Sequence, residues 1–230
     1  MSEMTDEILL SAIPELTGEQ VDRFRVYFDM LVDWNTRINL TRIVEPQEVA
    51  AKHFADSVLG SGLIKNGARV VDIGTGAGFP GIPIAIMRPD IELVLVDSLA
   101  KRIGFLDEVI KSLGIPAKTM HARAEDAARM NGMREGFDIA LSRAVAPMNV
   151  LLELTTPFIK VGGSSLMYKA ASVNDEIEES KNALKELKCK LIPHEYDVEW
   201  GQRSIVEAVK LGHTDKKYPR KAGTAQKKPL

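Results

Sequence analysis

The chain has a single cysteine, few aromatic residues and no long apolar run. Cys189 has no partner for an internal disulfide, and such sparing use of cysteine fits a reducing cytoplasm. No apolar run approaches the ~20 residues that span a bilayer, and the acidic start MSEMTDEILL does not resemble a secretory signal. We therefore expect a cytoplasmic protein that does not insert into a membrane.

Motifs for metal binding and nucleophilic catalysis are also missing. No histidine pairs with a cysteine or with another histidine at metal-ligand spacing, so the sequence predicts no metal site. Cys189 stands between two lysines with no histidine close by in the sequence, which disfavours a cysteine nucleophile. The formal net charge of −2 gives little long-range attraction, so a nucleic acid would have to be bound by local basic patches.

The N-terminal part of the chain carries helical patterns. Thr17 and Gln20 form a predicted capping box, and apolar residues then recur at three- to four-residue spacing as far as Trp34. Pro46 suits the first turn of another helix. We expect residues 1–62 to form a helical segment packed on the main domain.

From residue 69 strands and helices alternate, which predicts a doubly wound, mostly parallel α/β sheet in a main domain of residues 63–213. The predicted strands are 69–73, 92–96, 117–120, 137–141 and 164–168, the last following a turn at Gly162-Gly163. One predicted helix begins at 81, and others cover 100–113, 147–159 and 174–188, the last with Asn174 as N-cap. Residues 191–198 and 204–210 are expected to form a closing pair of strands.

The stretch Val70-Val71-Asp72-Ile73-Gly74-Thr75-Gly76-Ala77-Gly78-Phe79-Pro80-Gly81 predicts a buried strand followed by a glycine-rich turn. In α/β proteins this edge of the sheet binds the ligand, and glycines let the backbone approach it closely. Gly76-x-Gly78-x-x-Gly81 satisfies the dinucleotide pattern. Asp97, at the end of the second strand, suits the acid that binds ribose hydroxyls. Both features fit NAD and S-adenosylmethionine equally well.

Three further features favour S-adenosylmethionine. Asp72 lies inside an apolar strand, where an unpaired carboxylate is hard to justify structurally. A ligand with an ammonium and a sulfonium would explain this acid, whereas a pyrophosphate would be repelled by it. Glu125, after the third strand, suits an adenine amino group. Pro80 and Pro83 lengthen the junction between loop and helix beyond a tight dinucleotide turn.

These residues also have possible structural uses. The glycines suit a tight turn, Asp97 suits a helix N-cap, and Glu125 suits the first turn of a short helix.

Several separate motifs together resemble one family, the bacterial small-subunit (16S) rRNA guanine-N7 methyltransferases, known as RsmG or GidB. Besides the glycine loop, the resemblance rests on Trp34-Asn35, Asn39-Leu40-Thr41, His53-Phe54-Ala55-Asp56-Ser57, Asp97-Ser98, Lys101-Arg102, Phe105-Leu106, Arg123-Ala124-Glu125, Ser142-Arg143-Ala144 and the stretch from Tyr218 to Thr224. It spans nearly the whole chain. Ala225 departs from the proline that is usual in the family.

The resemblance implies a Rossmann-like methyltransferase sheet of seven strands, with an antiparallel last hairpin and S-adenosyl-L-methionine as cofactor. It implies cofactor contacts at Gly74, Phe79, Ala124, Glu125 and Arg143, which join Asp72, Gly76, Gly78 and Asp97 from the loop argument. Arg143 ends the fourth strand. The sequence leaves open whether it meets the cofactor's carboxylate, a substrate phosphate, or an internal acid such as Asp72 or Glu125.

The implied reaction methylates N7 of a guanine in 16S rRNA. N7 has a lone pair and no proton, so we expect positioning without a general base and hence no catalytic residue. The guanine should be unstacked, since N7 is buried in the deep groove of A-form RNA. Candidate RNA contacts are Arg37, Arg42 and Lys169, together with Lys216, Lys217, Arg220, Lys221, Lys227 and Lys228 of residues 214–230.

Residues 214–230 form a predicted basic tail, with six basic residues, one acid and no periodicity. Such a tail either contacts RNA or is a solvated charged end. Its deletion is expected to weaken RNA binding and to leave cofactor affinity nearly intact. We expect a monomer acting on 16S rRNA or a small-subunit particle. The alternatives are a methyltransferase with another RNA or a small molecule as substrate, and an NAD-binding or non-catalytic Rossmann protein.

Overall fold

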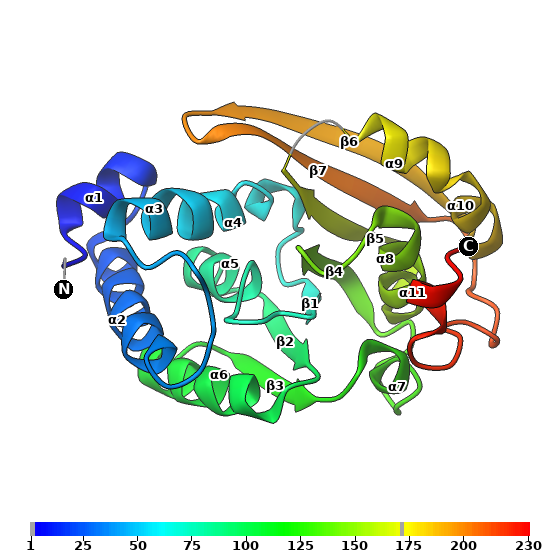
Figure 1. Cartoon of the computed structure of the whole chain (residues 1–230), viewed down its shortest axis with the longest axis horizontal. Helices are drawn as coiled ribbons and strands as arrows, with labels where there is room; N and C mark the ends of the chain where they lie inside the picture. Colours follow the sequence, from blue (N-terminus) through cyan, green and yellow to red (C-terminus); the bar gives the residue numbers. More distant parts are fainter. Residues whose placement is uncertain (1–2, 171–172) are drawn as a thin grey trace.

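A computed structural model describes residues 3–170 and 173–230. A seven-stranded sheet runs through it in the order β3-β2-β1-β4-β5-β7-β6 (Figure 1). Neighbours from β3 to β5 pair in parallel, whereas β7 is antiparallel to both β5 and β6. The strands are β1 (Arg69–Ile73), β2 (Glu92–Asp97), β3 (Ala117–His121), β4 (Phe137–Arg143), β5 (Ile159–Lys169), β6 (Cys189–Val198) and β7 (Gly201–Lys210). The predicted doubly wound sheet with an antiparallel closing hairpin is confirmed.

The N-terminal helices pack outside the helices that cover one face of the sheet. Thr17 and Gln20 form the predicted capping box, and Pro46 occupies the first turn of its helix. These helices are α1 (Asp6–Ala12), α2 (Gly18–Asn35), α3 (Pro46–Val49), the π-helical η1 (Ala50–Ala55), α4 (Asp56–Val58) and the short η2 (Ser61–Leu63). They contact α5 (Gly81–Met87) and α6 (Ala100–Leu113), so the predicted helical layer is confirmed.

The other face of the sheet carries the remaining helices. The central strands are buried on both faces. Val70 and Val71 are neighbours in β1 and point to opposite faces, and each belongs to a different apolar cluster. The helices are α7 (Ala124–Ala127), α8 (Met148–Thr155), η3 (Thr156–Phe158), α9 (Asn174–Glu179), α10 (Lys181–Leu187) and α11 (Thr224–Lys227). No helix within the described ranges is long and apolar enough to cross a bilayer.

The turn predicted at Gly162-Gly163 and the predicted end of the helix before it were wrong. Gly162-Gly163 is no turn but lies inside β5, where the pairing with β4 is irregular. A Cβ at Gly163 would stand 2.6 Å from the carbonyl oxygen of Asp138, so the irregular pairing itself requires glycine. The helix predicted to reach residue 159 ends at Thr155, and the short η3 leads directly into β5.

The predicted helix 174–188 is interrupted. It forms α9 and α10, which meet at Ser180, whose hydroxyl donates to the carbonyl of Glu176. A serine that bonds to its own backbone competes with the regular helical pattern. Val173 is the N-cap of α9, and Asn174 is its first residue.

The helical layer also fixes the glycine loop. Tyr27 of α2 is fully buried, with its ring against those of Phe54, Phe79 and Phe105. Its hydroxyl donates to the carbonyl oxygen of Ala77 within the loop. The N-terminal segment therefore supports the position of the loop directly.

Tyr27→Phe should lower the free energy of unfolding by about 1–3 kcal/mol, because the Ala77 carbonyl would be left buried without its donor. Tyr196→Phe is the control, since Tyr196 is half-exposed and its hydroxyl makes no hydrogen bond within the described residues. Urea unfolding monitored by circular dichroism measures both. Equal stability of the two variants would contradict a supporting role for Tyr27.

Candidate active site

The glycine loop crosses the carboxyl ends of β1 and β2. The amides of Gly74 and Thr75 both donate to the carbonyl of Val96, at 2.9 and 3.2 Å. Gly74 and Gly76 have positive φ angles of 69° and 63°, which glycine adopts with least strain. A Cβ at Gly76 would meet nothing within 4 Å, whereas one at Gly74 would lie 2.8 Å from Val145. Gly76 therefore opens onto free space at the edge of the sheet.

The next glycines serve internal packing. A Cβ at Gly78 would stand 2.6 Å from Ile82 and 2.8 Å from the hydroxyl oxygen of Tyr27. One at Gly81 would stand 2.8 Å from Oδ2 of Asp72. Gly78 lines neither of the two cavities described below, so the structure gives it a packing role and no part in their walls.

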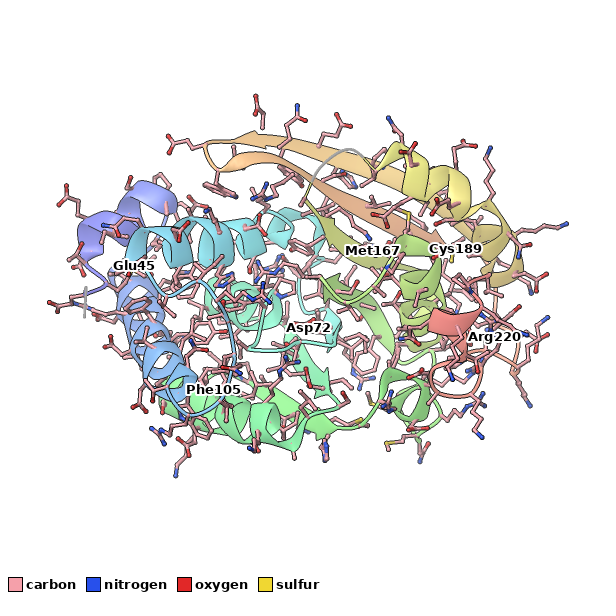
Figure 2. All side chains as sticks on the ribbon, viewed as in Figure 1. Glu45, Asp72, Phe105, Met167, Cys189 and Arg220 are labelled. Atoms are coloured by element: carbon pink, nitrogen blue, oxygen red, sulfur yellow. The ribbon has the colours of Figure 1, made fainter. Side chains whose placement is uncertain are left out.

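Asp72 is fully buried and lies near the centre of the molecule (Figure 2). Its Oδ2 accepts hydrogen bonds from the Thr75 hydroxyl at 2.7 Å and from the Gly81 amide at 2.9 Å. Burial raises the pKa of Asp72 to about 6, although these two bonds favour the charged form. The acid was expected to lack a structural use. That expectation was wrong for Oδ2, which binds the two ends of the loop, whereas Oδ1 is buried and makes no hydrogen bond among the described residues.

Asp97 ends β2 and is not the helix N-cap that the sequence suggested as an alternative, because Leu99 is the N-cap of α6. Its Oδ1 accepts from the Leu99 amide at 2.9 Å, a turn-capping contact at the start of α6. Its Oδ2 accepts from the Gly76 amide at 2.9 Å and from Arg102 at 3.3 Å. The carboxylate also forms part of the wall of a cavity, so its contacts within the protein and ligand binding do not exclude each other.

A smaller cavity of about 280 Å³ lies beyond Asp97. It brings together Asp97, Ala124 and Glu125, which the sequence predicted as cofactor contacts. Its lining residues are Ile73, Gly74, Val96, Asp97, Ser98, Arg102, Ala122, Arg123, Ala124, Glu125, Ala144, Val145, Leu154 and Gln226.

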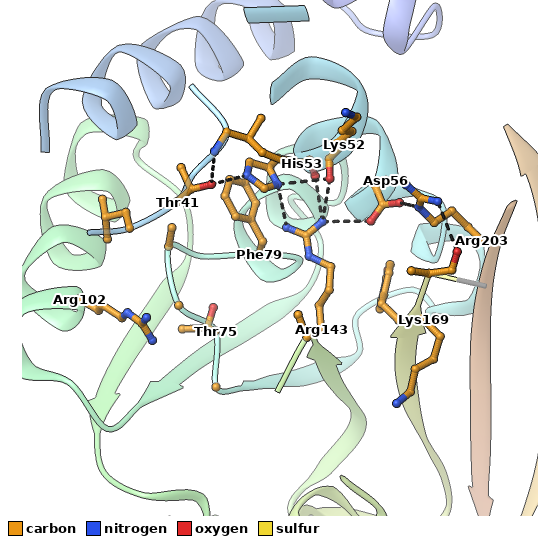
Figure 3. Close-up of a pocket in the computed structure, with 18 of the residues that line it drawn as sticks. Thr41, Lys52, His53, Asp56, Thr75, Phe79, Arg102, Arg143, Lys169 and Arg203 are labelled. Atoms are coloured by element: carbon orange, nitrogen blue, oxygen red, sulfur yellow. Dashed lines mark hydrogen bonds and ion pairs between the residues drawn. The ribbon is translucent and has the colours of Figure 1, made fainter. Parts of the chain in front are cut away.

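A larger cavity of about 550 Å³ adjoins it (Figure 3). Both cavities have Gly74, Arg102 and Ala144 in their walls. One acid, Asp56, lines this cavity among five cationic side chains, namely Lys52, Arg102, Arg143, Lys169 and Arg203. Gly76 and Phe79, two predicted cofactor contacts, belong to the same wall. The two cavities therefore form one continuous site across the ends of β1 and β4.

Arg143 projects into the larger cavity with its guanidinium fixed on one side. Nη1 lies 3.1 Å from Oδ2 of Asp56, and the guanidinium carbon stands 4.9 Å from the centre of the Phe79 ring. Asp72 and Glu125 were the internal partners considered from the sequence. Neither is correct, because the ion pair is formed with Asp56.

Asp56 anchors a second guanidinium as well. Its Oδ1 accepts from Nε of Arg203 at 2.7 Å and from the indole of Trp200 at 3.3 Å. Arg203 belongs to β7 and Trp200 to the tip of the closing hairpin, so one carboxylate joins the helical layer to the far end of the sheet. Asp56 is 7% exposed, which makes this charge well shielded from water.

His53 stacks on Phe79 with ring centres 4.5 Å apart. Its Nε2 lies 2.8 Å from the Thr41 hydroxyl. Burial, assisted by the charge of Arg143, lowers the pKa of His53 to about 4. The imidazole is therefore neutral at physiological pH.

The fold agrees with comparisons to known proteins. The family model for rRNA small subunit methyltransferase G matches residues 20–204. The chain belongs to this family. It is 48% identical to the ribosomal RNA small subunit methyltransferase G of Desulfitobacterium hafniense over 220 residues, which cover 94% of this chain and 92% of the relative. The protein of the same name from Clostridium perfringens is 46% identical over 222 residues, covering 94% of this chain and 93% of the relative.

Solved structures share the fold of this methyltransferase at low sequence identity. One is a SAM-dependent O-methyltransferase of Thermotoga maritima, with a TM-score of 0.53 at 14% identity, covering 81% of this chain and 73% of that chain. Another is a branched-chain polyamine synthase variant of Thermus thermophilus in complex with 5'-methylthioadenosine and a polyamine. Its TM-score is 0.58 at 13% identity, and it covers 82% of this chain and 64% of that chain.

The predicted RNA contacts are scattered over this methyltransferase. Lys169 lines the larger cavity, but its ammonium is bound by Glu176 at 2.6 Å. Arg37 pairs with Asp33 and lines a separate groove of about 480 Å³, whereas Arg42 is exposed in the loop after α2. The structure therefore brings only Lys169 of these three to the candidate active site.

Residues 214–230 are no solvated tail. Tyr218 and Ala225 are 4% and 2% exposed, so the segment packs against the domain. Arg220 forms an ion pair with the buried Glu153 at 2.5 Å, and Lys217 pairs with Glu186. Lys216 and Lys221 remain exposed. The alternative of a solvated charged end is therefore wrong.

Several residues of the site were missed, among them Thr41, Asp56 and Arg203. Thr41 and Asp56 stand in motifs that carried the family resemblance, and these motifs were the available signal, although no role was given to either residue. Arg203 had no signal, because only the pairing of β7 with β5 brings it to Asp56. No group of His, Cys, Asp or Glu suited to a metal ion occurs in residues 3–170 and 173–230.

Alanine at Gly76 and at Gly78 should have different effects. Gly78→Ala should lose about 2–4 kcal/mol of stability, because its Cβ collides with Ile82 and Tyr27 at a positive φ angle. Gly76→Ala should lose about 1–2 kcal/mol from its φ angle alone, and its methyl group should weaken ligand binding at the cavity. Urea unfolding and calorimetric titration with S-adenosylhomocysteine measure the two effects. Unchanged affinity of Gly76→Ala would show that no ligand approaches this glycine.

The buried His53 should make acid destabilise the protein. Between pH 6.5 and about 4 the unfolded histidine binds a proton that the folded one does not, so stability falls as the pH falls. His53→Asn removes this loss, and the stability difference between wild type and variant should shift by about 2–3 kcal/mol between pH 7 and 4. Urea unfolding at four pH values tests this. A constant difference across the range would mean that the histidine titrates normally.

Proposed function

We propose that this chain transfers the methyl group of S-adenosylmethionine to N7 of a guanine in the 16S rRNA of the small ribosomal subunit. Membership of the rRNA small subunit methyltransferase G family supports this assignment. The observation that carries it is the junction of the two cavities at Gly74. The smaller contains the predicted nucleoside-binding acids, and the larger is strongly cationic.

The residues of the smaller cavity fit an adenosine. The Asp97 carboxylate suits the ribose hydroxyls, and the Glu125 carboxylate suits the adenine amino group. Free space over Gly76 suits the methionine end, which would then extend toward the larger cavity. When bound there, S-adenosylmethionine supplies an electrophilic methyl group on a sulfonium.

The larger cavity suits an unstacked nucleotide. Its volume falls within the ~300–1,000 Å³ that is typical of ligand pockets. The cationic side chains favour the phosphates that flank an extruded base. Arg143 and Arg203 are held in place by Asp56, so their charges are preorganised for an anion and lose little freedom when they meet one.

The ionisable groups of the larger cavity are poorly suited to remove a proton. Asp56 is engaged by two arginines, and His53 has a pKa of about 4. The Tyr168 hydroxyl donates to the Ser57 carbonyl at 2.8 Å, and burial raises the pKa of Tyr168 far above its usual value. N7 of guanine carries no proton to remove. This reaction therefore matches the groups present better than methylation of an exocyclic amine does, since that amine must lose a proton.

Incubation of the purified protein with methyl-labelled S-adenosylmethionine and either 16S rRNA or small-subunit particles tests the assignment. Mass spectrometry of the digested RNA should find the label in 7-methylguanosine at a single position. Transfer RNA is the matched control substrate and should stay unlabelled. Label in another nucleoside, or in transfer RNA alone, would overturn the proposed substrate.

The absence of a general base also predicts a particular pH profile. The single-turnover methylation rate at saturating RNA should vary by no more than about twofold between pH 6.5 and 9. A base that must lose its proton in this range would instead raise the rate about tenfold per pH unit below its pKa. Rapid-quench measurements distinguish these profiles, and the steep slope would exclude catalysis by positioning alone.

A further inference from the structure

Residues 214–230 run as an anchored strap along the helices next to the smaller cavity (Figure 1). The Arg134 guanidinium donates to the backbone carbonyls of Thr214, Asp215 and Tyr218 at 2.9–3.1 Å. Arg134 thus holds the entry of the strap, together with Glu135, which accepts from the Thr214 amide, and Arg129, which donates to the Pro219 carbonyl. Because its backbone carbonyls are bound in this way, the segment cannot easily move away from the domain.

A buried ion pair fixes the middle of the strap. Glu153 of α8 is 1% exposed and accepts from both the side chain and the backbone amide of Arg220. Figure 2 shows Arg220 close to α11. Removing one partner from such a pair leaves an uncompensated buried charge, so breaking this contact is costly. The ion pair therefore holds the strap in place ahead of residues 221–230.

The end of the strap reaches the smaller cavity. The Gly223 amide donates to Oε1 of Glu125 at 2.8 Å, and Gly223 has a φ angle of +78° that suits glycine. The buried Ala225 packs against Leu154 and its neighbours. The Gln226 side chain then forms part of the cavity wall.

Two residues in the wall of this cavity have hydrogen-bonding groups with spare capacity. Among the described residues, Oε2 of Glu125 and the amide of Gln226 make no hydrogen bond. A glutamine amide carries donor and acceptor side by side, which matches an amino group next to a ring nitrogen on adenine. A neighbouring carboxylate adds a second acceptor for the amino group.

We propose that the strap is a wall of the cofactor site, in which Gln226 binds the adenosine and Glu125 is shared between adenosine and strap. This inference rests on the proposed function, because it takes the smaller cavity to hold the adenosine. Since the ligand would bind only where the strap is docked, ligand and strap stabilise each other. Residues 214–230 therefore belong to the cofactor site and not to a separate RNA-binding tail.

Calorimetric titration with S-adenosylhomocysteine tests the proposal on the full chain. Gln226→Ala should raise the Kd about three- to tenfold, the range expected for one neutral hydrogen bond. Lys227→Ala is the matched control, because Lys227 is an exposed neighbour on α11 that lines neither cavity. It should bind like the wild type. Both side chains are exposed, so neither substitution should prevent folding.

The outcomes separate this inference from the proposed function. If the wild type fails to bind S-adenosylhomocysteine, the proposed function itself fails. If the wild type binds and Gln226→Ala has the Kd of Lys227→Ala, the inference is overturned. Equal Kd values overturn the inference even if Gln226→Ala lowers the Tm of the free protein. A glutamine with a purely structural role would lower the Tm without changing the affinity.

Hydrogen exchange gives a second readout that does not depend on a substitution. Saturation of the wild type with S-adenosylhomocysteine should slow exchange of the amides of residues 223–228 severalfold, because the ligand holds the strap closed. Residues 6–12 of α1, remote from the cavity, serve as the internal control and should be unaffected. Unchanged exchange in residues 223–228 would contradict the coupling.

Discussion

Two buried carboxylates hold the glycine loop in shape. Asp72 at the end of β1 accepts from Thr75 and Gly81, and Asp97 at the end of β2 accepts from the amide of Gly76. Burying a carboxylate costs free energy unless it accepts hydrogen bonds. A loop that crosses the strand ends has backbone amides that are not paired within the sheet and can donate them. The loop satisfies Oδ2 of each carboxylate, whereas Oδ1 of Asp72 is buried with no hydrogen-bond partner among the described residues. Both cavities have this loop in their walls, so the whole site depends on these bonds.

The order of glycines in the loop reflects packing more than ligand binding. Gly78 and Gly81 complete the dinucleotide-like pattern, yet a Cβ at either would collide with Tyr27, Ile82 or Asp72. Only Gly74 and Gly76 line the cavities. A pattern of this kind therefore identifies a strand, a loop and a helix packed closely together. The chemistry of the ligand must be argued from the side chains around the loop.

The sequence predicted features whose cause is local. The capping box at Thr17, the alternating strands and helices and the acid at the end of β2 each depend on residues close together in the chain. The ion pair of Asp56 with Arg203 joins residues far apart in the sequence, and no periodic pattern in the sequence indicates it. The strap was missed for the same reason, because it is held by side chains that bind irregular backbone. Likewise, the irregular pairing at Gly163 arises from contact with β4.

Charge is distributed unevenly between the two halves of the site. The smaller cavity balances Asp97 and Glu125 against Arg102 and Arg123, whereas the larger has five cationic side chains and one acid. A protein of net charge −2 has no general attraction for RNA, so a phosphate backbone gains most where these cations gather. Asp56 lowers that charge but fixes two of its arginines. The pairing with Asp56 weakens the attraction of these two arginines for a phosphate but holds them in a fixed orientation. A reaction that relies on alignment alone benefits most from such fixed orientation.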